Sequence, residues 1–205
     1  LHLNDIENGQ KAILDGMDYF SNLASKYEQS GELLSLSQIF QIMKRYYGLL
    51  RDKNHFNLYS RKEAMSYVSL AKDKLIGDLP SNESAAYYRA AGLCYKDTNK
   101  NNIEAGTCFI LAGNYYKNAE KYVKASICYT DAAEMFESLE NYKQAYEFYI
   151  KSAEISLKAR NNEVAIENYI QAIDIYEKAN TKNDNAVYRL IELLEHYAEV
   201  QLSIN

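Results

Sequence analysis

The chain has 205 residues, with 28 acidic and 23 basic side chains and a net charge of −5. It contains only eight glycines and one proline. That scarcity argues against sandwiches, barrels and disordered tails, and it favours long helices joined by short turns. The sequence has no apolar run of about 18 residues, so we expect no membrane-spanning helix. The excess of acidic residues argues against nucleic acid as a partner.

Three cysteines, Cys94, Cys108 and Cys128, form an odd set without a paired short spacing. This pattern argues against a disulfide framework and against a zinc site. We expect reduced thiols that pack as small apolar core residues. A reduced chain of this kind is typical of the cytoplasm.

The first third of the chain predicts three amphipathic helices, at about residues 5–29, 32–53 and 58–77. Apolar residues recur there at steps of three, four and seven, which places them on one helix face. We interpret residues 51–57 as a polar break between the second and third helices. The sequence suggests a boundary near residue 80, with an N-terminal region, 1–80, continuous with a repeat region, 81–205.

The rest of the chain is a short repeat, in which the same pattern returns at fixed intervals. An alanine opens each copy, an aromatic residue follows four positions later, and a small residue follows three positions after that. The four copies are Ala105–Phe109–Ala112, Ala125–Tyr129–Ala132, Ala145–Tyr149–Ser152 and Ala165–Tyr169–Ala172. An earlier copy around residues 88–95 fits with a slip of one position, and a later helix is expected at about 185–203.

Positions 0, 4, 7 and 11 of this repeat lie on one face of a helix. Small residues there allow a neighbouring helix to approach closely, and we attribute Gly106 and Gly113 to the same cause. Each unit is one helix and one turn, so two units make an antiparallel hairpin of about 40 residues that is stable only when stacked. The sequence therefore predicts an all-α, right-handed solenoid of antiparallel helical hairpins with about nine helices.

The repeat resembles two known families. Its Ala-x3-Tyr-x2-Ala pattern is similar to the second helix of a tetratricopeptide (TPR) unit. The stretch from Thr107 to Lys117, Thr-Cys-Phe-Ile-Leu-Ala-Gly-Asn-Tyr-Tyr-Lys, resembles the soluble NSF attachment proteins, the SNAP family. The likeness continues in register through residues 125–128, 153–155 and 165–169. It implies a twisted array of helices that binds an assembled SNARE bundle and recruits a hexameric ATPase.

The same resemblance implies a partner-binding face. Family members carry basic residues where they grip the acidic bundle, and Lys117 falls at such a position, with two further lysines close by. Four tyrosines near or off the predicted apolar stripe are candidates for contact with a partner helix. The predicted partner-binding residues are Lys117, Lys121, Lys124, Tyr116, Tyr122, Tyr142 and Tyr146. Acidic residues nevertheless outnumber basic ones, twelve to nine, between residues 105 and 184.

No motif for catalysis, metal binding or phosphate binding occurs in the sequence. The histidines, His2, His55 and His196, lie on separate segments without zinc spacing. We therefore expect a non-catalytic protein-interaction module without a cofactor or metal, cytoplasmic and peripheral to membranes through its partners. The leading hypothesis is a SNAP-like adaptor for SNARE-type helical partners in vesicle trafficking. The alternative is a TPR-like scaffold subunit of an intracellular complex without a SNARE role, and an enzyme with a cryptic site is a third, minor possibility.

Overall fold

The structure is a computed structural model that describes residues 2–73, 82–98 and 102–179, together with positions 195, 198, 199 and 202. These residues form helices and no strand. The helices are α1 (His2–Ser30), α2 (Leu33–Leu49), α3 (Lys53–Asp73), α4 (Asn82–Lys96), α5 (Asn102–Asn118), α6 (Tyr122–Ser138), α7 (Tyr142–Lys158) and α8 (Asn162–Ala179). The predicted all-α class is confirmed. Except for positions 195, 198, 199 and 202, the ninth helix predicted at 185–203 lies outside the described residues.

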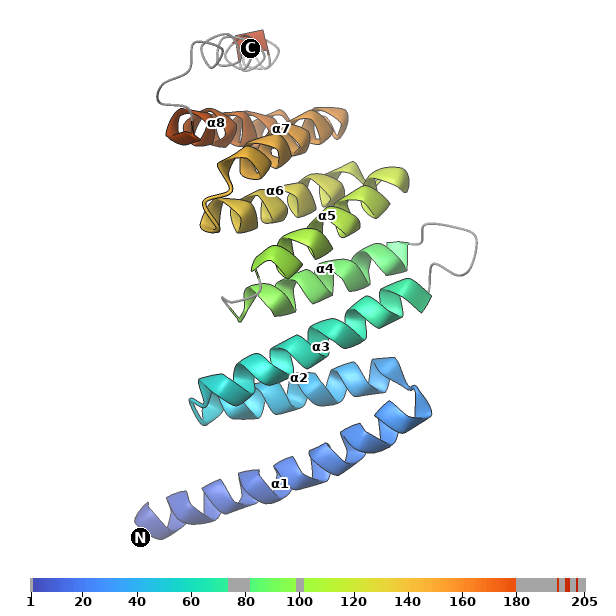
Figure 1. Ribbon diagram of the computed structural model, residues 1–205, viewed down its shortest axis with the longest axis vertical. Coiled ribbons are helices and arrows are strands. Elements are labelled where there is room, and N and C mark those ends of the chain that lie inside the picture. The colour runs from blue at the N-terminus through green and yellow to red at the C-terminus, as the bar shows by residue number, and fades with distance from the viewer. Residues whose placement is uncertain are drawn as a thin grey trace.

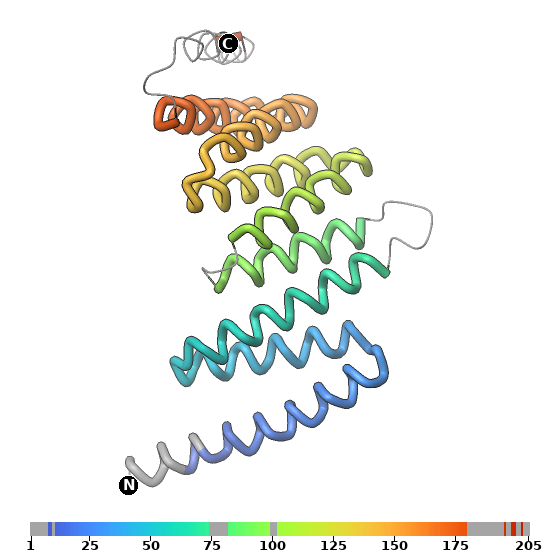
Figure 2. The backbone as a smooth tube through the Cα atoms, in the orientation of Figure 1, coloured from blue at the N-terminus to red at the C-terminus, as the bar shows by residue number. Residues whose placement is uncertain are grey.

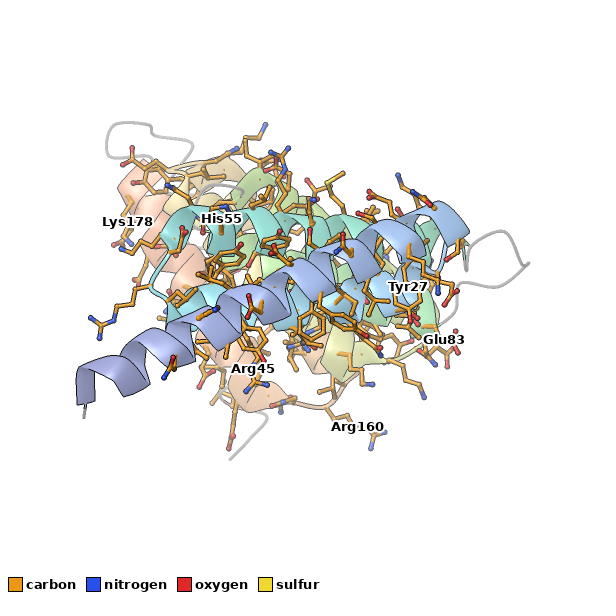
Figure 3. The ribbon with its side chains drawn as sticks, turned by 90° about the horizontal axis from the view of Figure 1, so that it is seen from below. Tyr27, Arg45, His55, Glu83, Arg160 and Lys178 are labelled. Carbon is orange, nitrogen blue, oxygen red and sulfur yellow. The ribbon has the colours of Figure 1, made fainter. Side chains whose placement is uncertain are left out.

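Each helix packs against its neighbours in chain order, from α1·α2 to α7·α8. The chain reverses direction at successive turns, so the turns alternate between the two sides of an elongated, twisted stack (Figure 1). The smooth trace of the backbone shows the same zigzag (Figure 2), and a view from the α1 end shows the helices stacked over one another (Figure 3). The predicted solenoid of antiparallel hairpins is confirmed.

The sequence repeat produces the core. The alanines that open the four copies, at 105, 125, 145 and 165, are all fully buried. The aromatic residues four positions later and the small residues at position 7 are also buried in every copy. Each aromatic ring fills the space that the small residues leave between adjacent helices, as the pattern predicts.

Glycines inside the helices mark the closest approaches. A Cβ atom on Gly92 would lie 2.7 Å from Cε1 of Phe109, and one on Gly106 would lie 3.2 Å from Cζ of Phe136. A Cβ atom on Gly113 would lie 2.8 Å from Cε1 of Tyr129. The interpretation of Gly106 and Gly113 as sites of close helix approach is confirmed.

The turns between α5 and α8 also repeat. Glu120, Glu140 and Arg160 occupy the same position in successive copies, and each adopts a left-handed backbone with φ of 56° or 57°. The amide of the residue after each of them donates a hydrogen bond to a carbonyl in the last turn of the preceding helix, for example Asn141 N–H to Phe136 O at 2.9 Å. This is the geometry of a helix-terminating Schellman motif. The three turns are therefore short and share the same backbone geometry.

The N-terminal boundaries differ from the predicted ones. α2 ends at Leu49 and α3 begins at Lys53, so the polar break predicted at 51–57 is wrong, and the turn is shorter than expected. The Asp52 carboxylate accepts hydrogen bonds from the amides of Asn54 and His55, both at 3.1 Å, and thereby caps α3. Polar residues that look like a loop in the sequence are therefore the exposed first turn of a helix.

An ion-pair cluster joins the first hairpins to the repeats. Nζ of Lys44 on α2 lies 2.9 Å from Oε2 of Glu63 on α3 and 3.3 Å from Oδ2 of Asp97 at the end of α4. Glu63 is only 2% exposed. A buried carboxylate without a partner is energetically costly, so the pair with Lys44 stabilises Glu63. Through its second contact with Asp97, Lys44 links α2, α3 and α4.

Candidate partner-binding surface

The solenoid presents two faces to possible partners. α4, α6 and α8 form the even face, where Lys96 of α4 pairs with Glu134 of α6 at 2.9 Å and Lys178 of α8 pairs with Glu137 of α6 at 3.1 Å. α3, α5 and α7 form the odd face. Each set brings together helices that are not consecutive in the chain.

The predicted lysines cluster around the turn between α5 and α6. Lys117 lies in the last turn of α5, Lys121 lies in the turn itself and is exposed, and Lys124 lies in the first turn of α6. Nζ of Lys124 lies 5.5 Å from the centroid of the Tyr116 ring, within the range of a cation–π contact. Among the described residues, none of the three lysines has an acidic partner within ion-pair distance. This turn is therefore a local concentration of positive charge on an acidic chain.

Sequence reasoning missed a fourth lysine, Lys151 on α7. Its Nζ lies 4.6 Å from the ring centroid of Tyr129 and 5.6 Å from that of Phe148. Burial lowers the pKa of Lys151, and the positive charge of Lys117 lowers this pKa further. Two cations on neighbouring helices of the odd face thus repel each other, and an anionic partner would relieve that repulsion.

The four predicted tyrosines do not form one exposed groove. Tyr116 is 4% exposed and packs in the core, so its prediction as an accessible contact residue is wrong. Tyr122 is half-buried against the same core cluster. Tyr142 and Tyr146 are also half-buried, but they lie next to the turn between α6 and α7. That turn is at the other end of α6, about 25 Å from the lysines at a rise of about 1.5 Å per residue.

An apolar groove of about 430 Å³ lies on the odd face between α3 and α5. Val68, Tyr95 and Leu111 contribute to its walls, and Ile103, with 62% of its surface exposed, lies at its rim. Grooves of this kind accept apolar side chains of a partner helix. The odd face therefore combines an apolar groove with the cations of Lys117 and Lys151.

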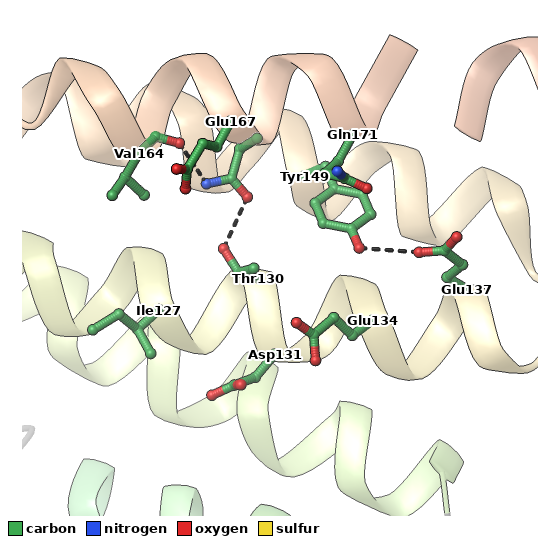
Figure 4. Close-up of a pocket in the computed structure, with 10 residues that line it drawn as sticks. Ile127, Thr130, Asp131, Glu134, Glu137, Tyr149, Val164, Glu167 and Gln171 are labelled. Atoms are coloured by element: carbon green, nitrogen blue, oxygen red, sulfur yellow. Dashed lines mark hydrogen bonds between the residues drawn. The ribbon is translucent and has the colours of Figure 1, made fainter. Parts of the chain in front are cut away.

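A second groove of about 600 Å³ lies on the even face between α6 and α8 (Figure 4). Four carboxylates line it, those of Asp131, Glu134, Glu137 and Glu167. The lining contains no lysine or arginine. The groove on the even face is therefore acidic.

Chemistry-bearing residues are not gathered elsewhere in the part of the chain that the structure describes. No group of three or more His, Cys, Asp or Glu residues there could hold a metal ion. All three cysteines are buried, and burial raises the pKa of Cys108 to about 11 and that of Cys128 to about 12. Within the same residues, no helix is both long enough and apolar enough to cross a bilayer.

The sequence profile of one family, described as soluble NSF attachment protein, SNAP, matches residues 63–198. This match covers more than half of the chain. The chain belongs to the SNAP family. The resemblance seen in the repeat motif is thereby confirmed, and the match begins at Glu63 of α3, so it includes every lysine of the α5–α6 turn. SNAP proteins are helical adaptors that act through protein partners, not enzymes.

Comparison with curated proteins finds no match to this SNAP-family chain. Among solved structures it is similar to BtubC (BKLC) from P. vanneervenii, with a TM-score of 0.49 and 12% identity over 92% of this chain and 80% of the other. It is also similar to the DHF119 filament, with a TM-score of 0.44 and 14% identity over 86% of this chain and 95% of the other.

Proposed function

We propose that this chain is a SNAP-type adaptor that binds an assembled SNARE-type helical bundle through the odd face. The observation that carries the proposal is the set of cations near the α5–α6 turn. Lys117, Lys121 and Lys151 lie outside every ion pair of the described residues, and Lys117 and Lys151 repel each other. An acidic bundle would supply the missing counter-charges.

The apolar groove between α3 and α5 supports the same partner class. A helical bundle presents both carboxylates and apolar side chains. On the odd face, the lysines can pair with the carboxylates and the groove can accept the apolar side chains. In this proposal Lys124 and the half-buried Tyr122 extend the contact at the α5–α6 turn. Tyr142 and Tyr146 contribute contacts at the opposite side of the array. The adaptor then acts in vesicle trafficking from the cytoplasm, held at membranes by its partners, and presents the bundle to a hexameric ATPase.

Charge reversal tests this assignment. Lys117→Glu with Lys121→Glu should weaken binding to an assembled four-helix SNARE bundle by at least tenfold, because both changes place negative charge against an acidic partner. The matched control is Lys11→Glu with Lys26→Glu, which changes the net charge equally at exposed positions on α1, away from the proposed face. Equal binding by the two double variants would contradict the proposed face.

The alternative is a scaffold subunit without a SNARE role. The even face favours it, because Leu93 of α4 and Ile127 of α6 expose 40% and 44% of their surfaces. A scaffold interface requires such a mixed apolar face. If the SNARE bundle does not bind and a stable intracellular complex contains the chain through this face, the scaffold is the better description.

A further inference from the structure

The groove between α6 and α8 has properties that the proposed SNARE contact does not use. It lies on the even face, whereas the proposed contact lies on the odd face. Its floor is a hydrogen-bonded network in which Thr130 Oγ1 donates to Oδ1 of Asn168 at 2.9 Å and Asn168 Nδ2 donates to Val164 O at 2.7 Å. Asn168 is 3% exposed, and its bond with Thr130 links α8 to α6 inside the fold.

Two of the four carboxylates in the groove are neutralised within the fold. Glu134 pairs with Lys96, and Glu137 accepts hydrogen bonds from Lys178 and from the Tyr149 hydroxyl, both at 3.1 Å. Asp131 and Glu167 have no ion pair among the described residues. These two carboxylates are therefore available to a cationic partner.

Asp131 is held in an unusual environment for a carboxylate. Its Oδ2 atom is buried and has no hydrogen-bond partner in the described structure. Burial raises the pKa of Asp131, and the more distant charges of Lys96 and Arg89 offset only part of this effect. A positive charge placed in the groove beside Asp131 would favour its ionised form and offset part of this burial cost.

Apolar side chains flank these carboxylates at helical spacing. On α6, Ile127 precedes Asp131 by four positions, and on α8, Val164 precedes Glu167 by three, so each pair lies on one helix face and lines the groove. Ile127 is 44% exposed and Val164 is half-buried. Figure 4 shows Ile127 and Asp131 on α6 below Glu167 and Gln171 on α8, on opposite walls of one groove.

We infer that this groove docks a basic amphipathic helix of a partner protein. Its apolar side chains would pack on Ile127 and Val164, and its lysine or arginine side chains would lie beside Asp131 and Glu167. Charge complementarity selects this occupant, because an acidic helix would add negative charge to a groove that already has an excess. The inference does not depend on the proposed SNARE contact.

A synthetic helical peptide about five turns long, with leucines on one face flanked by lysines at i, i+4 spacing, is a suitable probe. Titrated into the full chain labelled with 13C at isoleucine and valine methyl groups, it should shift the signals of Ile127 and Val164 saturably and leave Ile103 on the odd face unchanged. A peptide with glutamate in place of every lysine should produce no such shifts. Shifts spread over both faces, or shifts that do not saturate, would overturn the inference.

Variants separate a specific site from general attraction to an acidic protein. Asp131→Asn with Glu167→Gln should weaken peptide binding at least tenfold, whereas Glu28→Gln with Glu147→Gln should not, although both remove two exposed or partly exposed negative charges. The even-face double variant should still bind a SNARE bundle as the wild type does. Equal weakening by both pairs would overturn the groove as the docking site. A cooperative thermal melt with a midpoint no lower than that of the wild type verifies that each variant is folded.

Discussion

Gly113 on α5 faces the ring of Tyr129 on α6 so closely that a Cβ atom at residue 113 would lie 2.8 Å from Cε1 of that ring. Tyr129 is fully buried, and its hydroxyl donates a hydrogen bond to Oδ1 of Asn114 at 2.7 Å. The ring is therefore held at both ends and cannot move away. The repeat needs a residue without a side chain at this point.

Gly113→Ala should consequently lower the free energy of unfolding by about 1–3 kcal/mol, the usual cost of overpacking a core. Gly16→Ala in α1 is the matched control, because a Cβ atom there meets nothing within 4 Å. That control should raise stability by up to about 1 kcal/mol through helix propensity. Urea unfolding followed by circular dichroism measures both, and a gain of stability in Gly113→Ala would contradict the packing described.

At position 140 a glycine should stabilise the fold. The φ of Glu140, 56°, is unfavourable for a residue with a Cβ atom. Glu140→Gly should therefore stabilise the chain by about 0.5–1 kcal/mol, since glycine is the preferred residue at this point of a helix end. Glu147→Gly, in the interior of α7, should instead destabilise by about 1 kcal/mol. Thermal melts that rank the two variants in the reverse order would show that the turn differs from the one described.

Asp131→Asn should stabilise the fold at neutral pH. Because burial raises the pKa of Asp131, the folded state binds more protons than the unfolded state between pH 3.8 and the higher folded pKa. The contribution of this carboxyl to stability therefore falls as the pH rises through that window and is unfavourable at pH 7. Urea unfolding should show that the variant is more stable than the wild type at pH 7 and that the difference shrinks toward pH 4. A difference independent of pH would contradict this account.

The three cysteines should be unreactive in the folded chain. All are buried, and burial raises the thiol pKa values, to about 12 for Cys128, so almost no thiolate exists at pH 8. A chromogenic disulfide reagent at pH 8 should titrate three thiols in denaturant and react with the native chain only at the rate of unfolding. Rapid reaction of one native thiol would place that cysteine outside the core.

The burial of the repeat positions could be predicted because the same spacing of alanine, aromatic and small residues occurs four times in the sequence. The burial of Tyr116 could have been predicted too, since it occupies the same repeat position as Phe136, which is 5% exposed. The pattern that placed Ala105 and Ala125 in the core therefore already contained this signal. By contrast, the first turn of α3 could not be recognised, because its polar residues face solvent and only the Asp52 cap distinguishes them from a loop.

The binding surfaces depend on relationships that a sequence does not display. Lys117 and Lys151 stand at different positions of the repeat, and they meet because α5 and α7 lie on one face with a particular stagger. The groove between α6 and α8 likewise combines Asp131 and Glu167, which are separated in the sequence by the whole of α7. Such pairings follow from the twist of the stack, so both surfaces emerge only from the three-dimensional arrangement.

Co-sedimentation of the chain with an assembled four-helix SNARE bundle, at low and at physiological salt, tests the central claim most directly. The adaptor account predicts saturable binding that weakens as salt screens the lysines of the α5–α6 turn. Absence of binding at both salt concentrations would contradict it.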